Sequence, residues 1–489
     1  MGVDGYRTDT RFDALTLHAL GVPVTRLATD SRLVEPGDVF VAVPGARIDG
    51  RRFIAQAIAA GAVGVLWEAA DFHWDPAWRV PNLAVPNLIE QLGLIAARVY
   101  GDPSHRMWVA GVTGTNGKTS CSHWIAQSLT RLGRRTAVLG TLGNGFLGEL
   151  TPGTHTTPDA ASLQAQLADL LSRGASGVVM EVSSHGLEQG RVNGVAFGAA
   201  LFTNLSRDHL DYHGSMEEYG AAKARLFHWD SLHHAVINLD DGFGAQLARS
   251  LDRSRVSVLG YGLGKGEISG HRLDLSKRGL KLEIETPWGA GVIRSQLLGA
   301  FNAANLLGVL GVLLAAGVEL DAATSVLETV EPVPGRLQML RRPGRPLVVV
   351  DYAHSPDALE KVLETLRSVL GSEGRLICVF GCGGERDTGK RPLMGETATR
   401  LADSVFVTSD NPRGEDPRAI VDQIIAQAHP NYHVEIDRAA AIHLALREAR
   451  PEDLVLIAGK GHEAYQEIAG RRVPFSDAEV AASVLGQTP

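Results

Sequence analysis

The chain has 489 residues, a formal net charge of −8 at pH 7 and hydrophobic residues at 44% of its positions. Since domains usually span roughly 100 to 200 residues, this length predicts about three of them. Acidic and basic residues are interspersed, so no basic face can follow a nucleic-acid backbone, and no nucleic-acid partner is expected.

The apolar runs and the cysteines exclude further classes of protein. The longest apolar run, residues 306–318, has 13 residues. It is shorter than the roughly 20 residues that cross a bilayer and predicts a buried helix. The chain start lacks the basic region and apolar core of a secretory signal, so we expect a cytoplasmic protein without membrane insertion. Cys121, Cys378 and Cys382 suit neither a disulfide framework nor a zinc set and are predicted to be buried free thiols.

The first segment mixes short strands, such as residues 38–43, with a helix around residues 53–60. This pattern predicts a small α/β domain over residues 1–105. The turn cluster at residues 101–104 marks its end, because Gly, Asp, Pro and Ser interrupt regular structure.

A glycine-rich loop follows at residues 111–120, between an apolar strand over residues 108–112 and a helical pattern that includes Ile125 and Leu129. Glycines let several backbone N–H groups and a helix N-terminus face an anion, Lys118 adds a charge, and Thr119 offers a hydroxyl to Mg²⁺. Five residues, not the usual four, separate Gly111 from Gly117. A nucleoside triphosphate is the predicted ligand, whereas a Gly-Lys-Thr that occurs in a loop by chance would bind none.

Three further features lie in the same predicted central domain, residues 106–335, for which we expect a mostly parallel sheet. A strand over residues 177–182 contains Glu181 near its end, where a nucleotide-binding sheet places a metal-handling acid. The polar motif at residues 203–214 contains His209, and its spacing fits a metal ligand and a hydrogen-bonded loop histidine equally well. Lys223 lies on a predicted helix and, taken alone, is predicted to be solvated.

Asparagines and an arginine near the end of this domain give weaker signals. Asn302 and Asn305 share one helix face and could cap the apolar helix or contact a nucleotide. Arg336, which follows a proline-rich turn, is by itself more typical of a surface residue.

The last third of the chain, residues 336–489, repeats one pattern four times. Apolar strands over residues 347–350, 376–380, 405–408 and 454–458 each run into a polar, Gly- or Pro-containing motif, and helical patterns separate them. Alternating strands and helices predict a Rossmann-like, doubly wound parallel sheet, in which ligands bind beyond the carboxyl ends of the strands. The four motifs are therefore expected to converge.

Together these residues resemble the Mur ligase family, the ATP-dependent amide-forming ligases of bacterial peptidoglycan precursor synthesis. The resemblance covers essentially the whole chain and implies ATP and Mg²⁺ as cofactors and a monomer. It implies catalytic roles for Lys118, His209, Lys223, Asn302, Arg336 and Asp351. The implied ATP contacts are Gly114, Thr115, Asn116, Gly117, Lys118, Thr119, Ser120, Asn302, Asn305, Arg336 and Asp351, and the implied metal ligands are Thr119, Glu181, His209 and Lys223 as its carbamate.

Within the family, the Asp-Asn-Pro-Arg motif at residues 410–413 resembles that of members that add meso-2,6-diaminopimelate to UDP-MurNAc-L-Ala-D-Glu. The guanidinium of Arg413 can pair with a carboxylate that lysine as a substrate lacks. A lysine-adding ligase, folylpolyglutamate synthase and a phosphate-loop NTPase switch are the alternatives. The implied diaminopimelate contacts are Arg386, Asp410, Asn411, Pro412, Arg413, Gly459 and Glu463, and those to the nucleotide sugar are Thr29, Ser31, Ala46, Arg47, Ile48, Thr156, Thr157, Ser183, Gln189 and Arg191.

Overall fold

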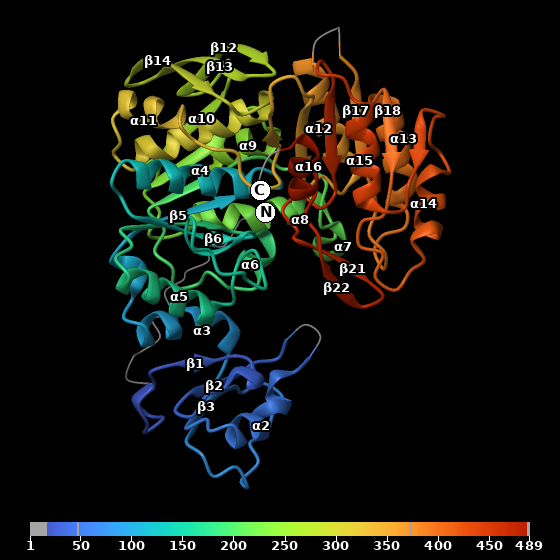
Figure 1. The fold of residues 1–489 in the computed structure, drawn as a ribbon. Helices are drawn as coiled ribbons and strands as arrows, with labels where there is room; N and C mark the ends of the chain where they lie inside the picture. Colours follow the sequence, from blue (N-terminus) through green and yellow to red (C-terminus); the bar gives the residue numbers. More distant parts are fainter. Residues whose placement is uncertain (1–16, 46–47, 371–373, 487–489) are drawn as a thin grey trace. The chain divides into compact units, whose positions relative to one another are not determined.

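The structure, a computed structural model, describes residues 17–45, 48–370 and 374–486 (Figure 1). These residues form mixed α/β layers, as predicted, with sheets of four, ten, six and two strands. The chain divides into two compact units. The first comprises the described chain up to Ser269 together with Leu307–Ala323, and the second comprises Gly270–Leu306 and the chain from Thr324 onward.

The N-terminal part of the first unit is a four-stranded parallel sheet with helices on both faces. Its order is β1 (Leu27–Ala28), β2 (Val39–Ala42), β3 (Gly64–Glu68) and β4 (Asn82–Val85). Side chains alternate along β2, because Phe40 packs with α2 (Ile54–Ala59) while Val41 packs with α3 (Leu88–Val99). The strand and helix predicted here are therefore confirmed as β2 and α2.

The ten-stranded sheet has the order β14-β13-β12-β11-β10-β9-β5-β8-β6-β7. The pairs that join β11, β10, β9, β5, β8 and β6 are parallel, and β7 and the β13–β14 hairpin pair antiparallel. The strands are β5 (Trp108–Thr113), β6 (Thr136–Gly140), β7 (Gly143–Phe146), β8 (Gly177–Glu181), β9 (Ala199–Phe202), β10 (His234–Asn238), β11 (Ser257–Leu263), β12 (Ile268–Ser276), β13 (Gly279–Thr286) and β14 (Gly289–Ser295). The helices that follow or connect them are α4 (Lys118–Arg131), α5 (Ala160–Ser172), α6 (Ser184–Glu188), α7 (Leu210–His213), α8 (Met216–Ala224), α9 (Gly242–Ser250), α10 (Ala300–Ala315) and α11 (Leu320–Leu327).

Helix α10 differs from its predicted extent. It runs from Ala300 to Ala315, whereas the apolar run that indicated it covers residues 306–318, and Asn302 and Asn305 lie in its first two turns, consistent with their predicted shared helix face. The residues of the apolar run from Leu306 to Leu314 are buried, as expected, whereas Phe301 in the first turn is exposed. None of the helices among the described residues is long and apolar enough to span a membrane.

The C-terminal part of the second unit is the predicted doubly wound sheet, with the order β15-β16-β20-β17-β18-β19. Only the β15–β16 pair is antiparallel within this sheet. Val349 and Leu456 pack with α12, α13 and α14, whereas Val348 and Ile457 pack with α15 and α16 on the other face. The elements are β15 (Gln338–Leu340), β16 (Leu347–Asp351), α12 (Pro356–Leu370), β17 (Leu376–Phe380), α13 (Lys390–Leu401), β18 (Ser404–Val407), α14 (Pro417–Ile425), β19 (Tyr432–Val434), α15 (Arg438–Glu448), β20 (Leu454–Ala458), β21 (Tyr465–Ile468), β22 (Arg471–Pro474) and α16 (Asp477–Leu485).

Cys121, Cys378 and Cys382 are buried free thiols, as predicted. Burial raises the pKa of each thiol, so none is a reactive thiolate at neutral pH.

Candidate active site

The glycine-rich loop at residues 111–120, the predicted phosphate loop, leads into the N-terminus of α4. Gly114 and Gly117 have φ angles of +143° and +84°, and a Cβ on Gly114 would lie 2.0 Å from Thr203 Oγ1. The N–H of Thr115 donates to the carbonyl of Asn204 at 2.8 Å, which ties the loop to the end of β9. Glycine is therefore required at residue 114 by both conformation and space.

The side chains of Lys118 and Thr119 contact the loop itself and the neighbouring strand β8. Lys118 Nζ donates to the carbonyl oxygens of Gly114 and Thr115 at 2.8 and 2.9 Å, so its ammonium lies on the loop itself. Thr119 Oγ1 donates to Glu181 Oε2 at 3.0 Å, and Glu181 is buried at the carboxyl end of β8. Because β5 and β8 are neighbouring parallel strands, the loop and this carboxylate meet at one edge of the sheet.

Lys223 is buried, with 1% of its surface exposed, so the prediction of a solvated lysine is wrong. Its Nζ donates to the carbonyl of Gly114 at 3.0 Å and lies 4.3 Å from the centre of the Tyr219 ring. Desolvation, and then the charge of Lys118, lower the pKa of Lys223 well below its ordinary value. The amine therefore faces the phosphate loop in a setting that favours its neutral form.

His209 lies beside the same tyrosine. Its ring centre is 6.0 Å from that of Tyr219 and 5.0 Å from that of His185, and its backbone has a φ of +53°. Burial, and then the charges of neighbouring histidines, lower the pKa of His185 to about 4, so this ring is neutral at pH 7. Both interpretations of His209, as metal ligand and as loop histidine, stay predictions. Among the described residues, no group of three or more His, Cys, Asp or Glu side chains is arranged to hold a metal ion.

Four of the residues proposed for the nucleotide sugar form one hydrogen-bonded network. Thr157 Oγ1 contacts Ser183 Oγ at 3.0 Å, Arg191 Nη1 donates to the Thr157 carbonyl at 2.9 Å, and Arg191 Nε donates to Gln189 Oε1 at 2.9 Å. Thr156 is linked to Glu181 through Thr141. The hydroxyls of Thr156 and Thr141 lie 3.1 Å apart, and the Thr141 hydroxyl donates to the Glu181 carboxylate.

The remaining residues of that set lie in the N-terminal part. Ser31 Oγ donates to Gln56 Oε1 at 3.2 Å, and Thr29 Oγ1 lies 3.5 Å from a carboxylate oxygen of Asp159, the N-cap of α5. Ile48 is exposed, and Ala46 and Arg47 lie outside the described residues.

In the second unit, Asp351 orders the turn that carries Arg336. The Asp351 carboxylate accepts hydrogen bonds from the backbone N–H groups of Leu337 and Ala353, each at 2.8 Å. Desolvation raises its pKa, and the charge of Arg336 opposes that shift. The Arg336 guanidinium lies 4.7 Å from the centre of the Tyr352 ring, which indicates cation–π stacking.

Asn302 and Asn305 form a local pair on α10. Both are buried, Asn302 Nδ2 donates to the carbonyl of Leu298 at 2.9 Å, and Asn305 Nδ2 donates to Asn302 Oδ1 at 3.3 Å. The amide of Asn302 therefore satisfies a carbonyl at the start of the helix.

Strand ends of the C-terminal sheet converge as expected, because a Cβ on Gly459 would lie 2.6 Å from Asp410 Oδ2 and 3.7 Å from the carbonyl of Gly381. Arg413 has a left-handed backbone, φ +53°, and the short hydrogen bonds of its N–H and C=O to the β21–β22 hairpin hold it there. Its Nη1 donates to the carbonyl of Gly384 at 2.6 Å and its Nε lies 3.4 Å from Glu467. Arg386 is exposed, and Pro412 packs its carbonyl against Gly384.

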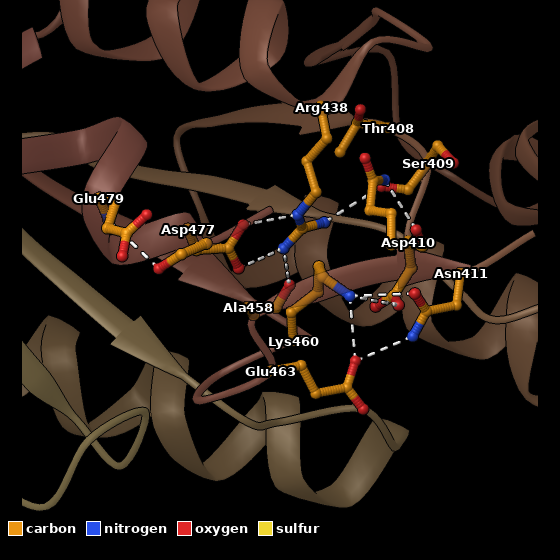
Figure 2. Close-up of polar contacts among 12 residues, drawn as sticks. Thr408, Ser409, Asp410, Asn411, Arg438, Ala458, Lys460, Glu463, Asp477 and Glu479 are labelled. Carbon is orange, nitrogen blue, oxygen red and sulfur yellow. Dashed lines mark hydrogen bonds and ion pairs between the residues drawn. The ribbon is translucent and has the colours of Figure 1, made fainter. Parts of the chain in front are cut away.

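Two buried cations near these strand ends, Lys460 and Arg438, were not predicted from the sequence. Lys460 Nζ lies 3.0 Å from Glu463 Oε2, 3.0 Å from Asn411 Oδ1 and 3.9 Å from Asp410 Oδ1 (Figure 2). Arg438 makes a bidentate ion pair with Asp477, at 2.7 and 2.8 Å. A lysine between two glycines is typical of a solvated loop, so nothing in the local sequence indicated that Lys460 is buried.

Three family models match consecutive parts of the chain. They are "Mur ligase family, catalytic domain" at residues 23–100, "Mur ligase middle domain" at residues 112–313 and "Mur ligase, glutamate ligase domain" at residues 335–461. A protein of Chromobacterium violaceum is 54% identical over 476 residues, 97% of each chain. The chain belongs to the Mur ligase family. It is an ATP-dependent, amide-forming ligase.

Two relatives of this Mur ligase carry the same name. The Chromobacterium protein and a Neisseria meningitidis protein that is 50% identical over 94% of each chain are both called UDP-N-acetylmuramoyl-L-alanyl-D-glutamate–2,6-diaminopimelate ligase. A solved structure of the same name matches this Mur ligase with a TM-score of 0.72 and 40% identity, over 95% of each chain. These matches confirm the predicted family and its fold.

Proposed function

We propose that this Mur ligase joins meso-2,6-diaminopimelate to the D-glutamate γ-carboxylate of UDP-MurNAc-L-Ala-D-Glu, with ATP as the energy source, in peptidoglycan precursor synthesis. The γ-carboxylate attacks the γ-phosphorus of ATP, ADP leaves, and an acyl phosphate forms. An amine of diaminopimelate then attacks the acyl carbon, loses a proton and displaces phosphate. We expect the enzyme to act as a cytoplasmic monomer.

The first unit provides the groups proposed for phosphoryl transfer. The loop N–H groups of residues 114–120 and the start of α4 would face the triphosphate, and Lys118 would add positive charge, so that negative charge developing on the phosphoryl group is stabilised. The network of Thr157, Ser183, Gln189 and Arg191 is our proposed contact for the nucleotide sugar.

The residues around the loop fit a magnesium ion. Mg²⁺ is typically held by one or two carboxylates together with substrate phosphates, so a dense protein cluster is not required. Glu181 and Thr119 already contact each other. Lys223 Nζ contacts the carbonyl of Gly114, so a carbamate on this lysine would add a second carboxylate beside the loop. The neutral amine that carbamylation needs is the form that the environment of Lys223 favours. Bound Mg²⁺ would neutralise phosphate charge.

The second unit provides the groups that we assign to the nucleotide and the amino acid. Asn302, Asn305, Arg336 and Asp351 are the proposed nucleotide contacts. Arg413 carries the choice of amino acid, because its planar fork, fixed at the end of β18 by the β21–β22 hairpin, matches a carboxylate. Diaminopimelate has a distal carboxylate and lysine does not.

Phosphate release with ATP, Mg²⁺ and UDP-MurNAc-L-Ala-D-Glu tests this function when meso-diaminopimelate and L-lysine are compared and the product is weighed. We expect release and an amide product with diaminopimelate. Preference for lysine would contradict the assignment to Arg413, and hydrolysis without an amino acid would instead indicate a nucleotide switch.

A further inference from the structure

Lys460 is a buried cation at the end of β20, and no part of its side chain is exposed. Its neighbours come from two loops, because Asn411 follows β18 whereas Glu463 follows β20 (Figure 2). The Tyr465 ring lies 5.6 Å from Nζ. An ammonium buried this completely is stable only when carboxylates and hydrogen-bond acceptors surround it.

The ammonium determines how Asn411 is oriented. Lysine can only donate, so the side-chain oxygen of Asn411 faces Nζ at 3.0 Å, and it also accepts the N–H of Glu467 at 2.9 Å. The amide nitrogen of Asn411 therefore points to Glu463 Oε2, at 2.8 Å. That one carboxylate oxygen accepts from both Lys460 and Asn411, whereas Glu463 Oε1 has no hydrogen bond from a described residue.

Charges alternate along this row of residues, which we call the charge row: Asp477, Arg438, Asp410, Lys460 and Glu463 (Figure 2). Arg438 also donates to the carbonyls of Ala458 and Ser409, which fixes the ends of β20 and β18. Asp477 and Arg438 have no exposed side-chain surface, whereas 22% of the Glu463 side chain is exposed. With three carboxylates and two cations, the row has a formal net charge of −1, and its accessible end is negative.

We infer that Lys460 is a positioning residue for the amino acid substrate, which holds Glu463 Oε2 and Asn411 so that Glu463 Oε1 receives the distal ammonium group of diaminopimelate. This inference rests on the proposed function. The ammonium completes the alternation of the charge row, and the carboxylate that binds it is fixed before the substrate arrives. Such preorganisation lowers the entropy cost of binding.

Kinetics of Lys460→Met with two amino acids test the inference. 2-Aminopimelate lacks the distal amine, so it cannot use Glu463. We expect the KM for meso-diaminopimelate to rise about 30-fold or more, as when one partner of a buried charge pair is lost. The KM values for ATP and the nucleotide sugar should stay within about twofold, and the preference for meso-diaminopimelate over 2-aminopimelate should largely disappear.

Matched variants separate positioning from general stability. Arg375→Met removes a partly buried ion pair with Asp453 at the opposite ends of the strands and should leave the preference intact. Lys460→Gln replaces Lys460→Met if the latter does not fold, because it removes the charge but keeps polar contacts. In a Glu463→Gln background, Lys460→Met should add little, since both act through one carboxylate.

Three outcomes would overturn the inference while the wild type still uses diaminopimelate. They are an unchanged preference in the Lys460 variants, equal increases in all three KM values, and additive effects of the two substitutions. If the wild type itself does not use diaminopimelate, the proposed function fails first, and the two failures are thus distinguished.

Discussion

Arg413 is the residue at which substrate choice can be altered with the least disturbance, since 19% of its side chain is exposed and its backbone is held independently by the β21–β22 hairpin. We predict that Arg413→Lys lowers kcat/KM for meso-diaminopimelate about 100-fold or more, because a lysine ammonium cannot form two parallel hydrogen bonds to a carboxylate. Steady-state kinetics with meso-diaminopimelate and L-lysine would measure the change in preference.

Arg418→Lys is the control for that substitution, because Arg418 is an exposed arginine of α14 that pairs with Asp422. It should be neutral. Equal activity of the Arg413→Lys and wild-type enzymes with diaminopimelate would show that the distal carboxylate is recognised elsewhere.

At single residues, the sequence identified motifs better than it identified burial. Lys223 was predicted to be solvated from its helix alone, and only the carbamate implied by the family resemblance requires the neutral amine that its burial favours. Lys460 was missed because its partner Asn411 lies 49 residues earlier in the chain. Burial of a lysine depends on distant carboxylates and amides, and local composition does not encode those contacts.

Among the elements, the turn before β15 gives a direct test of close backbone packing. Gly335 has a φ of +68°, and a Cβ there would lie 2.1 Å from the backbone N of His462. Gly344 has a similar φ of +72° but open space around it. We predict that Gly344→Ala costs about 1 kcal/mol of folding free energy, whereas Gly335→Ala costs about 3 kcal/mol or more, because the backbone of the Gly459–Glu463 loop must also shift. Denaturant unfolding would measure both.

Since Arg336 follows Gly335 directly, Gly335→Ala should also raise the KM for ATP if Arg336 contacts the nucleotide as proposed. Equal losses of stability in the two alanine variants would mean that the turn relaxes without disturbing the Gly459–Glu463 loop.

Strands with one continuous apolar run were predicted closely, as for β16, β17 and β20. Such runs are typical of parallel strands that helices cover on both faces. The β13–β14 hairpin was not predicted, because Leu280, Leu282 and Ile284 alternate with less buried residues and make a much weaker apolar signal. The apolar signal of α10 begins only at residue 306, because Asn302 and Asn305 in its first two turns are polar.

Across the whole molecule, several ionisable groups at the proposed sites are buried away from water, although their charged forms are best stabilised by water. Burial raises the pKa values of Asp351 and Asp410 and lowers that of Lys223. In each case the neutral form is favoured relative to the unfolded chain, so the charged form costs folding free energy. These three residues therefore reduce stability, which is expected when side chains are selected for chemistry rather than packing.

Lys223→Met should accordingly give a chain that is inactive but more stable at neutral pH. Between the lowered pKa of Lys223 in the fold and its ordinary value of 10.5, the unfolded chain binds a proton that the folded chain does not, so the free energy of unfolding rises with pH. This contribution has a limiting slope of about 1.4 kcal/mol per pH unit. Lys223→Met lacks it, so its stability advantage should shrink as the pH rises and vanish above 10.5.

Thermal or denaturant unfolding of both chains at several pH values, in buffer free of bicarbonate, measures the difference between their free energies of unfolding. The contributions of the other titrating groups largely cancel in this difference. Added bicarbonate should then stabilise the wild type and leave Lys223→Met unchanged. Only the lysine can form a carbamate, and a modification that forms preferentially in the folded state stabilises that state. Parallel pH curves for the two chains would contradict the desolvation of Lys223. Equal responses of the two chains to bicarbonate would contradict the carbamate but not the desolvation of Lys223. A desolvated amine is necessary for carbamylation but does not by itself produce it.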